Sequence, residues 1–182
     1  FMSAESSDNW GPNGLGYYLA ARMLWDADEA GRIDELREDF LARCFGPARE
    51  PMDRFYRLID GSDPPLWSSD LVGRMYRLLE RAGRSIDGAA DADGAIRRRL
   101  DHLVLYTRYV DLYRRYETAA KAGRQAAAER MMRHVYRIRP TMMVHAKGIA
   151  RALERDKSVR VPAEARWNVS DAKNPWKSGR FP

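Results

Sequence analysis

The sequence has 182 residues, of which 45% are hydrophobic, so it can bury one substantial hydrophobic core. No apolar run approaches the ~20 residues that a membrane-spanning helix needs, and we expect a soluble chain without a membrane partner. Cys44 is the single cysteine, which excludes an internal disulfide and a cysteine-based zinc site. We predict that it is a buried apolar side chain. The sequence does not specify a cellular compartment, because it is compatible with a signal peptide upstream of these residues.

The charge of the chain is positive, with a formal net charge of +6 and a pI near 9.6. Such basicity raises the question of nucleic-acid binding. The arginines are mixed with Asp and Glu along helix surfaces, and the sequence clusters them only at Arg97–Arg99. No aromatic or helix-turn-helix signature accompanies that cluster, so we expect a solvated surface and no nucleic-acid partner.

The first 26 residues combine a short apolar segment, a polar turn and an apolar helix. Residues 1–4 are compatible with the end of a buried strand, and the Ser, Asp, Asn, Gly and Pro residues of 6–12 predict a turn. Asn13 is a suitable N-cap for a helix that continues to Trp25. This helix is apolar on nearly every face, so it needs cover on nearly every face. The segment therefore resembles one βα unit.

The rest of the chain up to residue 155 predicts amphipathic helices. Gly46-Pro47 ends the first of them, Ser68 or Ser69 caps the third, and residues 83–94 form a loop. Gly123 is expected to end the longest helix, and Pro140 to interrupt the chain before the last one. The predicted helices span residues 31–45, 48–59, 70–82, 95–122, 124–139 and 141–155.

These patterns predict an all-α fold, a bundle of about six to seven helices with a residual N-terminal strand. We divide the chain into a βα unit at 1–26, a helical domain at 27–155 and an extended tail at 156–182. Trp167 and Trp176 are the large apolar side chains of that tail, and we expect them to anchor it to a surface.

The best candidates for chemistry lie in the N-terminal turn. If residue 4 ends a barrel strand, Glu5 points to the face where such barrels hold their active sites, so Glu5 is the catalytic candidate. Asp8, Asn9 and Trp10 are substrate-binding candidates, since carboxylates suit acid-base work on glycosides and an indole suits a sugar ring. The alternative is structural: Asp8 and Asn9 cap the turn, and Trp10 fills a gap beneath it.

The histidines and tyrosines are weaker candidates for a functional site. No two histidines have metal-binding spacing, so we expect no metal and no cofactor. His134 and His145 are predicted to be buried rings, each bonded to backbone. Four tyrosines recur at helical spacing and are more typical of a packing seam than of a ligand site. These are Tyr106, Tyr109, Tyr113 and Tyr116.

Several segments of the sequence together form a recognisable pattern. They are ESSDNWGP at 5–12, GLGYYLAAR at 14–22, LWD at 24–26, FGPA at 45–48 with Pro51–Met52, YTRYV at 106–110, and RHVYRIR at 133–139 with MVH at 143–145. These segments resemble a bacterial family of uncharacterised domains related to α-glucuronidase-type glycoside hydrolases. The similarity covers most of the chain up to about His145.

This resemblance implies a (β/α) barrel whose last strand and helix open the sequence, followed by a helical region packed on the barrel. The chain is then the C-terminal helical portion of a glycoside-hydrolase-like protein, inactive by itself, with carbohydrate as partner of the full-length protein. The alternative is a helical structural or protein-interaction module without catalytic activity. The apolar N-terminal helix also predicts self-association, with part of Tyr17, Tyr18, Leu24 and Trp25 exposed.

Overall fold

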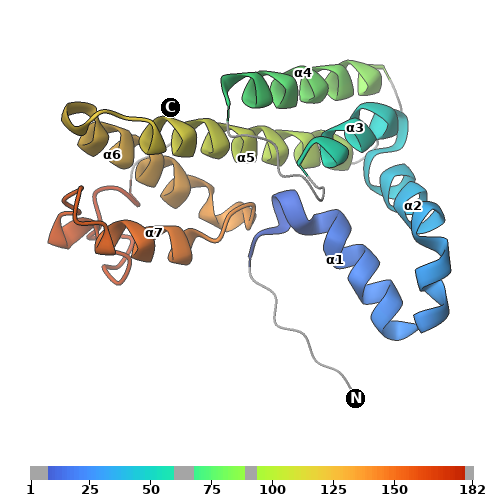
Figure 1. The fold of residues 1–182 in the computed structure, drawn as a ribbon, viewed down its shortest axis with the longest axis horizontal. Coiled ribbons are helices and arrows are strands. Elements are labelled where there is room, and N and C mark those ends of the chain that lie inside the picture. The colour runs from blue at the N-terminus through green and yellow to red at the C-terminus, as the bar shows by residue number, and fades with distance from the viewer. Residues whose placement is uncertain (1–7, 60–67, 89–93, 179–182) are drawn as a thin grey trace.

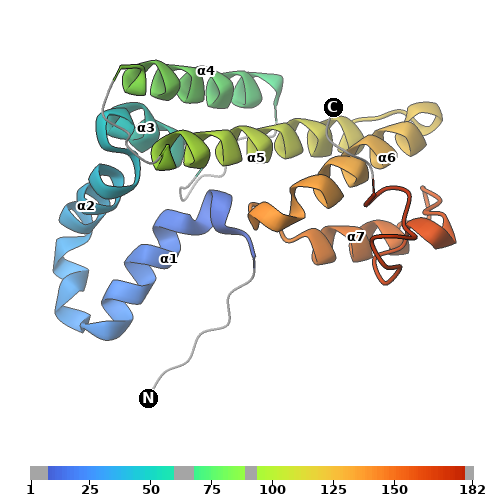
Figure 2. The ribbon, with the colours of Figure 1, turned by 180° about the vertical axis from the view of Figure 1, so that it is seen from behind.

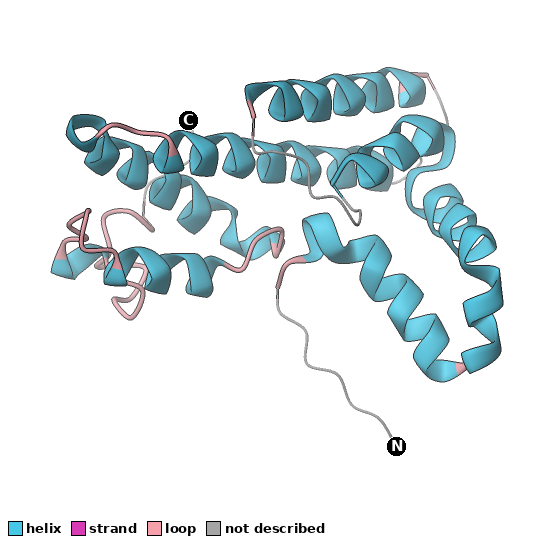
Figure 3. Cartoon of the chain, in the orientation of Figure 1, coloured by secondary structure: helices cyan, strands magenta, loops and turns pink. Residues whose placement is uncertain are grey.

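The computed structural model describes residues 8–59, 68–88 and 94–178, and all regular structure in these ranges is helical (Figure 3). The predicted all-α class is confirmed, and the described residues contain no strand. The strand predicted at residues 1–4 lies outside them. The α-helices are α1 (Trp10–Trp25), α2 (Ile33–Phe45), α3 (Arg49–Ile59), α4 (Ser69–Ile86), α5 (Ala95–Glu117), α6 (Lys121–Ile138) and α7 (Ala146–Arg155). The 3-10 turns are η1 (Ala27–Arg32), η2 (Gly46–Ala48), η3 (Arg139–Thr141) and η4 (Ala163–Ala165).

Helix α5 is the longest element and runs through the middle of the molecule (Figure 1). Helices α3 and α4 pack beside its N-terminal half, whereas α6 and α7 pack at its C-terminal half. Helices α1 and α2, joined by η1, form an arm that projects from the first of these groups, as the opposite view also shows (Figure 2).

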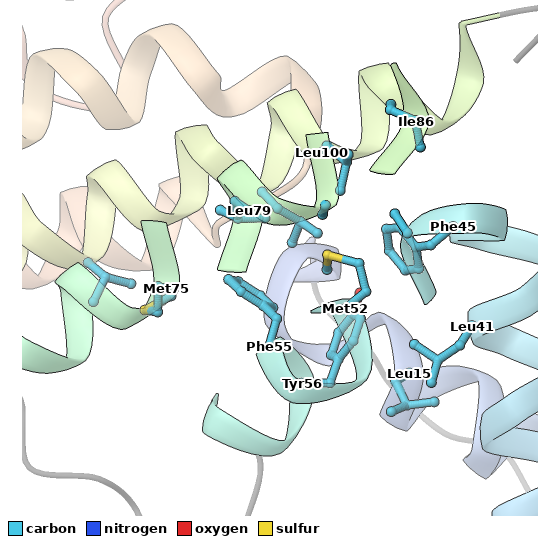
Figure 4. Close-up of a cluster of buried hydrophobic side chains, with 14 of the residues drawn as sticks. Leu15, Leu41, Phe45, Met52, Phe55, Tyr56, Met75, Leu79, Ile86 and Leu100 are labelled. Atoms are coloured by element: carbon cyan, nitrogen blue, oxygen red, sulfur yellow. The ribbon is translucent and has the colours of Figure 1, made fainter. Parts of the chain in front are cut away.

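The first core cluster lies where α1 to α4 meet the N-terminal half of α5 (Figure 4). Met52, Phe55 and Met75 are fully buried at its centre. Burial of an apolar side chain of this size contributes roughly 1.5–3 kcal/mol, so this cluster is the main reason that α3 and α4 pack on α5. Leu15 is the residue of α1 that enters the cluster completely.

The second core cluster joins α6, α7 and the chain after residue 156 to the C-terminal half of α5. Tyr136 is buried at its centre, donates a hydrogen bond to the carbonyl of Ala165 at 2.8 Å and stacks on Trp167. Trp176 is buried in the same cluster. Residues 156–178 thus wrap against α6 and α7, and Trp167 and Trp176 anchor them there.

Helix α1 begins three residues earlier than the predicted N-cap, Asn13. Its first residue is Trp10, whose N–H donates to the carbonyl of Met142 at 3.0 Å. Pro12 fits in this first turn, because N–H groups there have no acceptor within the helix. Gly11 is buried against Met143, and a Cβ at this position would lie 3.1 Å from the Met143 sulfur.

Other boundaries were predicted with mixed success. Gly46 ends α2 as expected, with a φ of 48° that favours glycine. The prediction that Gly123 ends the longest helix was wrong: α5 stops at Glu117, and Gly123 lies in the first turn of α6. The alanines around it favour helix on both sides, so propensity does not locate the break. Likewise α4 extends beyond residue 82, because Ile86 is buried in the first core cluster.

The last helix, α7, begins at Ala146 instead of residue 141. Met142 has a positive φ of 57°, and the chain forms a turn before the helix resumes. None of the described helices is both long enough and apolar enough to cross a lipid bilayer. The division of the chain at residues 26 and 155 remains a prediction.

Candidate functional site

Three of the four predicted site residues lie together at the N-terminus of α1. Asp8 and Asn9 precede the helix and Trp10 begins it, whereas Glu5 lies outside the described residues. Asn9 occupies the N-cap position but makes no capping hydrogen bond through its side chain. Trp10 is 44% exposed, with its ring edge-to-face on Tyr17, so it does not fill an interior gap.

Asp8 has a partner that the sequence did not reveal. Its Oδ1 lies 2.5 Å from Nδ1 of His145, which is the N-cap residue of α7. The prediction of a buried His145 bonded to backbone was wrong, because this imidazole is exposed and pairs with a side chain 137 residues away. A Cβ at position 148 would lie 2.2 Å from the ring, so Gly148 makes room for this orientation.

His134 behaves as predicted. Its Nε2 lies 2.9 Å from the carbonyl oxygen of Leu105 on α5, and the ring is half-buried between α5 and α6. Burial lowers the pKa of His134 because an imidazolium loses hydration there. The neutral ring therefore ties α6 to α5, and it does not take part in the N-terminal site.

A small pocket of about 230 Å³ opens beside Trp10. Its walls come from α1, α2, α3, α5 and the turn before α7, so segments distant in sequence meet there. A cavity of this size accepts one small ring. The lining residues are Trp10, Gly11, Gly14, Phe40, Cys44, Phe45, Tyr56, Arg99, His102, Leu103 and Met143.

Arg99 and His102, both from α5, bring ionisable nitrogen groups to the lining of the Trp10 pocket. Arg99 donates from Nη1 to the carbonyl of Cys44 at 3.0 Å, which fixes its guanidinium at the edge of the pocket. Cys44 is half-buried, and desolvation raises the pKa of its thiol. A protonated thiol is a poor nucleophile, so the pocket is equipped for binding more than for covalent chemistry.

The four tyrosines of α5 form a continuous row, with ring centroids of successive pairs 6.3, 6.1 and 6.4 Å apart. Tyr106 and Tyr109 pack against both core clusters. Burial raises the pKa of Tyr106 to about 12, so this hydroxyl stays protonated. The row is a packing seam between the two clusters.

The described residues contain no group of three or more His, Cys, Asp or Glu side chains placed to hold a metal ion. Comparison with protein-family models, with curated proteins and with solved structures gave no match. The geometry and the sequence patterns are therefore the basis for any functional assignment.

Proposed function

We propose that this chain is the C-terminal helical portion of a glycoside-hydrolase-like, carbohydrate-active protein, and that the outer face of α1 packs on the catalytic barrel. The alternative is a helical interaction module without catalytic activity. The resemblance of the N-terminal segments favours a barrel of the same protein.

The exposed apolar surface at the tip of the arm carries this proposal. Leu24 is 50%, Trp25 93% and Ile33 44% exposed, where α1 turns through η1 into α2. Large apolar side chains gathered at one place on a surface are typical of an interface. The described part of the tail, residues 156–178, packs elsewhere, because Trp167 and Trp176 belong to the second core cluster. Tyr17 and Tyr18 are half-buried, so the expected exposure falls on Leu24 and Trp25.

The Trp10 pocket supports the carbohydrate part of the proposal. A half-exposed indole offers a flat apolar surface for a sugar ring, and Arg99 and His102 offer hydrogen-bonding groups beside it. In this proposal Asp8, Asn9 and Trp10 contact the carbohydrate, and Glu5 serves as the catalytic carboxylate. The Asp8–His145 pair then holds Asp8, ahead of α1, beside the start of α7.

The interface is tested with the double substitution Leu24→Ser and Trp25→Ser. In the 182-residue chain the melting temperature should stay within about two degrees, because both side chains are exposed. In the full-length protein the same double substitution should lower the melting temperature by more than two degrees, because a buried contact with the barrel is lost. Val104→Ser, at another exposed apolar side chain, is the matched control. Equal melting temperatures for the full-length protein and its double variant would contradict docking on a barrel.

The enzymatic role is tested separately with Glu5→Gln in the full-length protein. Hydrolysis of aryl glycosides should be abolished, while the melting temperature changes by no more than about two degrees, as for an exposed site residue. Trp10→Ala should raise KM more than it lowers kcat, because Trp10 binds and does not react. Undiminished hydrolysis by the Glu5 variant would return this residue to a structural role and favour the interaction module.

A further inference from the structure

A second concave surface lies between α3 and α4 and encloses about 560 Å³. Its lining differs from that of the Trp10 pocket, because most of the described residues that form it are arginines. Five arginines, Arg54, Arg57, Arg74, Arg77 and Arg81, line it together with Leu58 and Leu78. We name this surface the arginine groove.

Helical spacing explains why these arginines gather. On α3, residues 54, 57 and 58 share one face, and on α4 the same holds for residues 74, 77, 78 and 81. Helices α3 and α4 pack side by side, so these two faces border one groove. The linear sequence scatters the same arginines over 28 positions, and they do not form a run there.

The described residues of the groove and their ion-pair partners include more guanidinium groups than carboxylates. Glu50, Asp53 and Asp70 are the acidic partners of its arginines, and Asp53 is shared with Arg37 outside the groove. The ion pairs are Arg54–Glu50 at 2.6 Å, Arg81–Glu50 at 3.7 Å, Arg57–Asp53 at 2.8 Å and Arg77–Asp70 at 3.8 Å. Among the described residues, three carboxylates thus accompany five guanidinium groups, so this set of side chains is net positive.

Arg74 differs from the other four arginines of the groove because it has no ion-pair partner among the described residues. It is exposed and makes no ion pair or hydrogen bond with another described residue. A guanidinium presents several N–H donors in a planar fork that matches a carboxylate. Arg74 therefore offers such a fork to a ligand, and the long, weak pair of Arg77 with Asp70 can be exchanged at little cost.

The floor of the groove restricts the kind of ligand. Leu58 and Leu78 are half-buried and leave apolar surface between the arginines. The volume suits several side chains rather than a single ion. We propose that the arginine groove binds an acidic, amphipathic helical segment of a partner protein. Its carboxylates pair with Arg74 and Arg77, and its apolar side chains cover Leu58 and Leu78.

Nucleic acid fits this surface less well. Among the described residues, no aromatic side chain lines the groove for stacking on bases. Glu50 and Asp70 border it and oppose a continuous row of phosphates, whereas a peptide can space its carboxylates to avoid them. The inference is independent of the carbohydrate proposal, because the arginine groove shares no lining residue with the Trp10 pocket.

The test uses a fluorescent synthetic peptide with leucines at helical positions i, i+3, i+4 and i+7 and glutamates elsewhere. Binding to the 182-residue chain is followed by fluorescence anisotropy at low and at physiological salt. Arg74→Glu reverses a charge without breaking an ion pair of the described residues, so the fold should persist, as circular dichroism can verify. Arg130→Glu on α6 is the matched control, because Arg130 is also exposed and makes no ion pair with the described residues.

We expect Arg74→Glu to weaken peptide binding at least about tenfold and Arg130→Glu less than about twofold, because only the first acts on a direct contact. A scrambled peptide of equal composition should bind less tightly, since its leucines no longer share one face. Absence of peptide binding, or equal losses in the two variants, would overturn the proposal. So would tighter binding of duplex DNA that Arg74→Glu abolishes, or self-association that the same variant removes.

Discussion

At the scale of single residues, the C-terminal segment depends on Asn174, which is fully buried. Its Nδ2 donates to the carbonyl of Arg166 at 3.0 Å, and its Oδ1 accepts from the N–H groups of Trp176 and Lys177 at 2.9 and 3.2 Å. The ammonium of Lys177 in turn donates to the carbonyls of Trp167 and Val169. These bonds replace the regular backbone ladder that residues 166–178 lack.

We expect Asn174→Ala to destabilise the chain by about 2–3 kcal/mol, because it leaves buried backbone N–H and C=O groups without partners. Urea denaturation followed by tryptophan fluorescence measures this, since Trp167 and Trp176 lie in the same cluster. Asn168→Ala changes an exposed asparagine of the same segment and should cost less than about 0.5 kcal/mol. Equal effects of the two substitutions would contradict the role given to Asn174.

At the scale of elements, α4 shows how a single cap selects a helix start. Ser68 has an extended backbone, and its Oγ accepts a hydrogen bond from the N–H of Leu71 at 3.1 Å. Ser69 is the first residue of the helix and makes no such bond. The sequence admitted either serine, and the structure assigns the cap to Ser68.

Ser68→Ala should therefore lower the free energy of unfolding by about 1 kcal/mol, the usual cost of an N-cap. Ser69→Ala should be neutral or slightly stabilising, because alanine favours the helix and no capping bond is lost. Thermal denaturation of both variants under the same conditions gives the comparison. A larger loss for Ser69→Ala would show that the helix begins one residue later than described.

At the scale of the whole molecule, α5 is a member of both core clusters. Leu100, Leu103 and Val110 contribute to the first cluster, and Leu112 and Tyr116 to the second. The tyrosine row continues along the same helix between them. Because both clusters include residues of α5, neither cluster can stay fully packed if α5 unfolds. We therefore expect the two clusters to unfold together in one cooperative transition.

Met75→Ala and Met131→Ala test this coupling, since each methionine is buried in one of the two clusters. Each should cost about 2–5 kcal/mol through lost burial and an unfilled cavity. If α5 couples the clusters, either variant unfolds in a single transition, with hydrogen exchange increased in both halves. Two separate transitions, one for each cluster, would show that α5 does not couple them.

Much of the fold was accessible from local pattern. The apolar periodicity of α2 to α6 predicted these helices, and Gly46-Pro47 predicted the end of α2, because backbone restriction acts at the residue itself. The start of α1 and the α5–α6 break were missed for a different reason. The hydrogen bond from Trp10 to Met142 fixes the start of α1, and this contact is not visible in the local sequence. The alanines on both sides of the α5–α6 break favour helix, so no local signal marks the break.

The candidate site residues likewise include some that local sequence predicts and some that only the tertiary structure brings together. The sequence by itself determined the all-α class, the candidates Asp8, Asn9 and Trp10, and the apolar nature of α1, since each follows from residue type and spacing. Only the tertiary structure decided that His145 pairs with Asp8, that Arg99 and His102 line the same pocket as Trp10, and that arginines of α3 and α4 share a groove. These are contacts between residues far apart in the chain, and helix packing, which no local pattern encodes, brings them together.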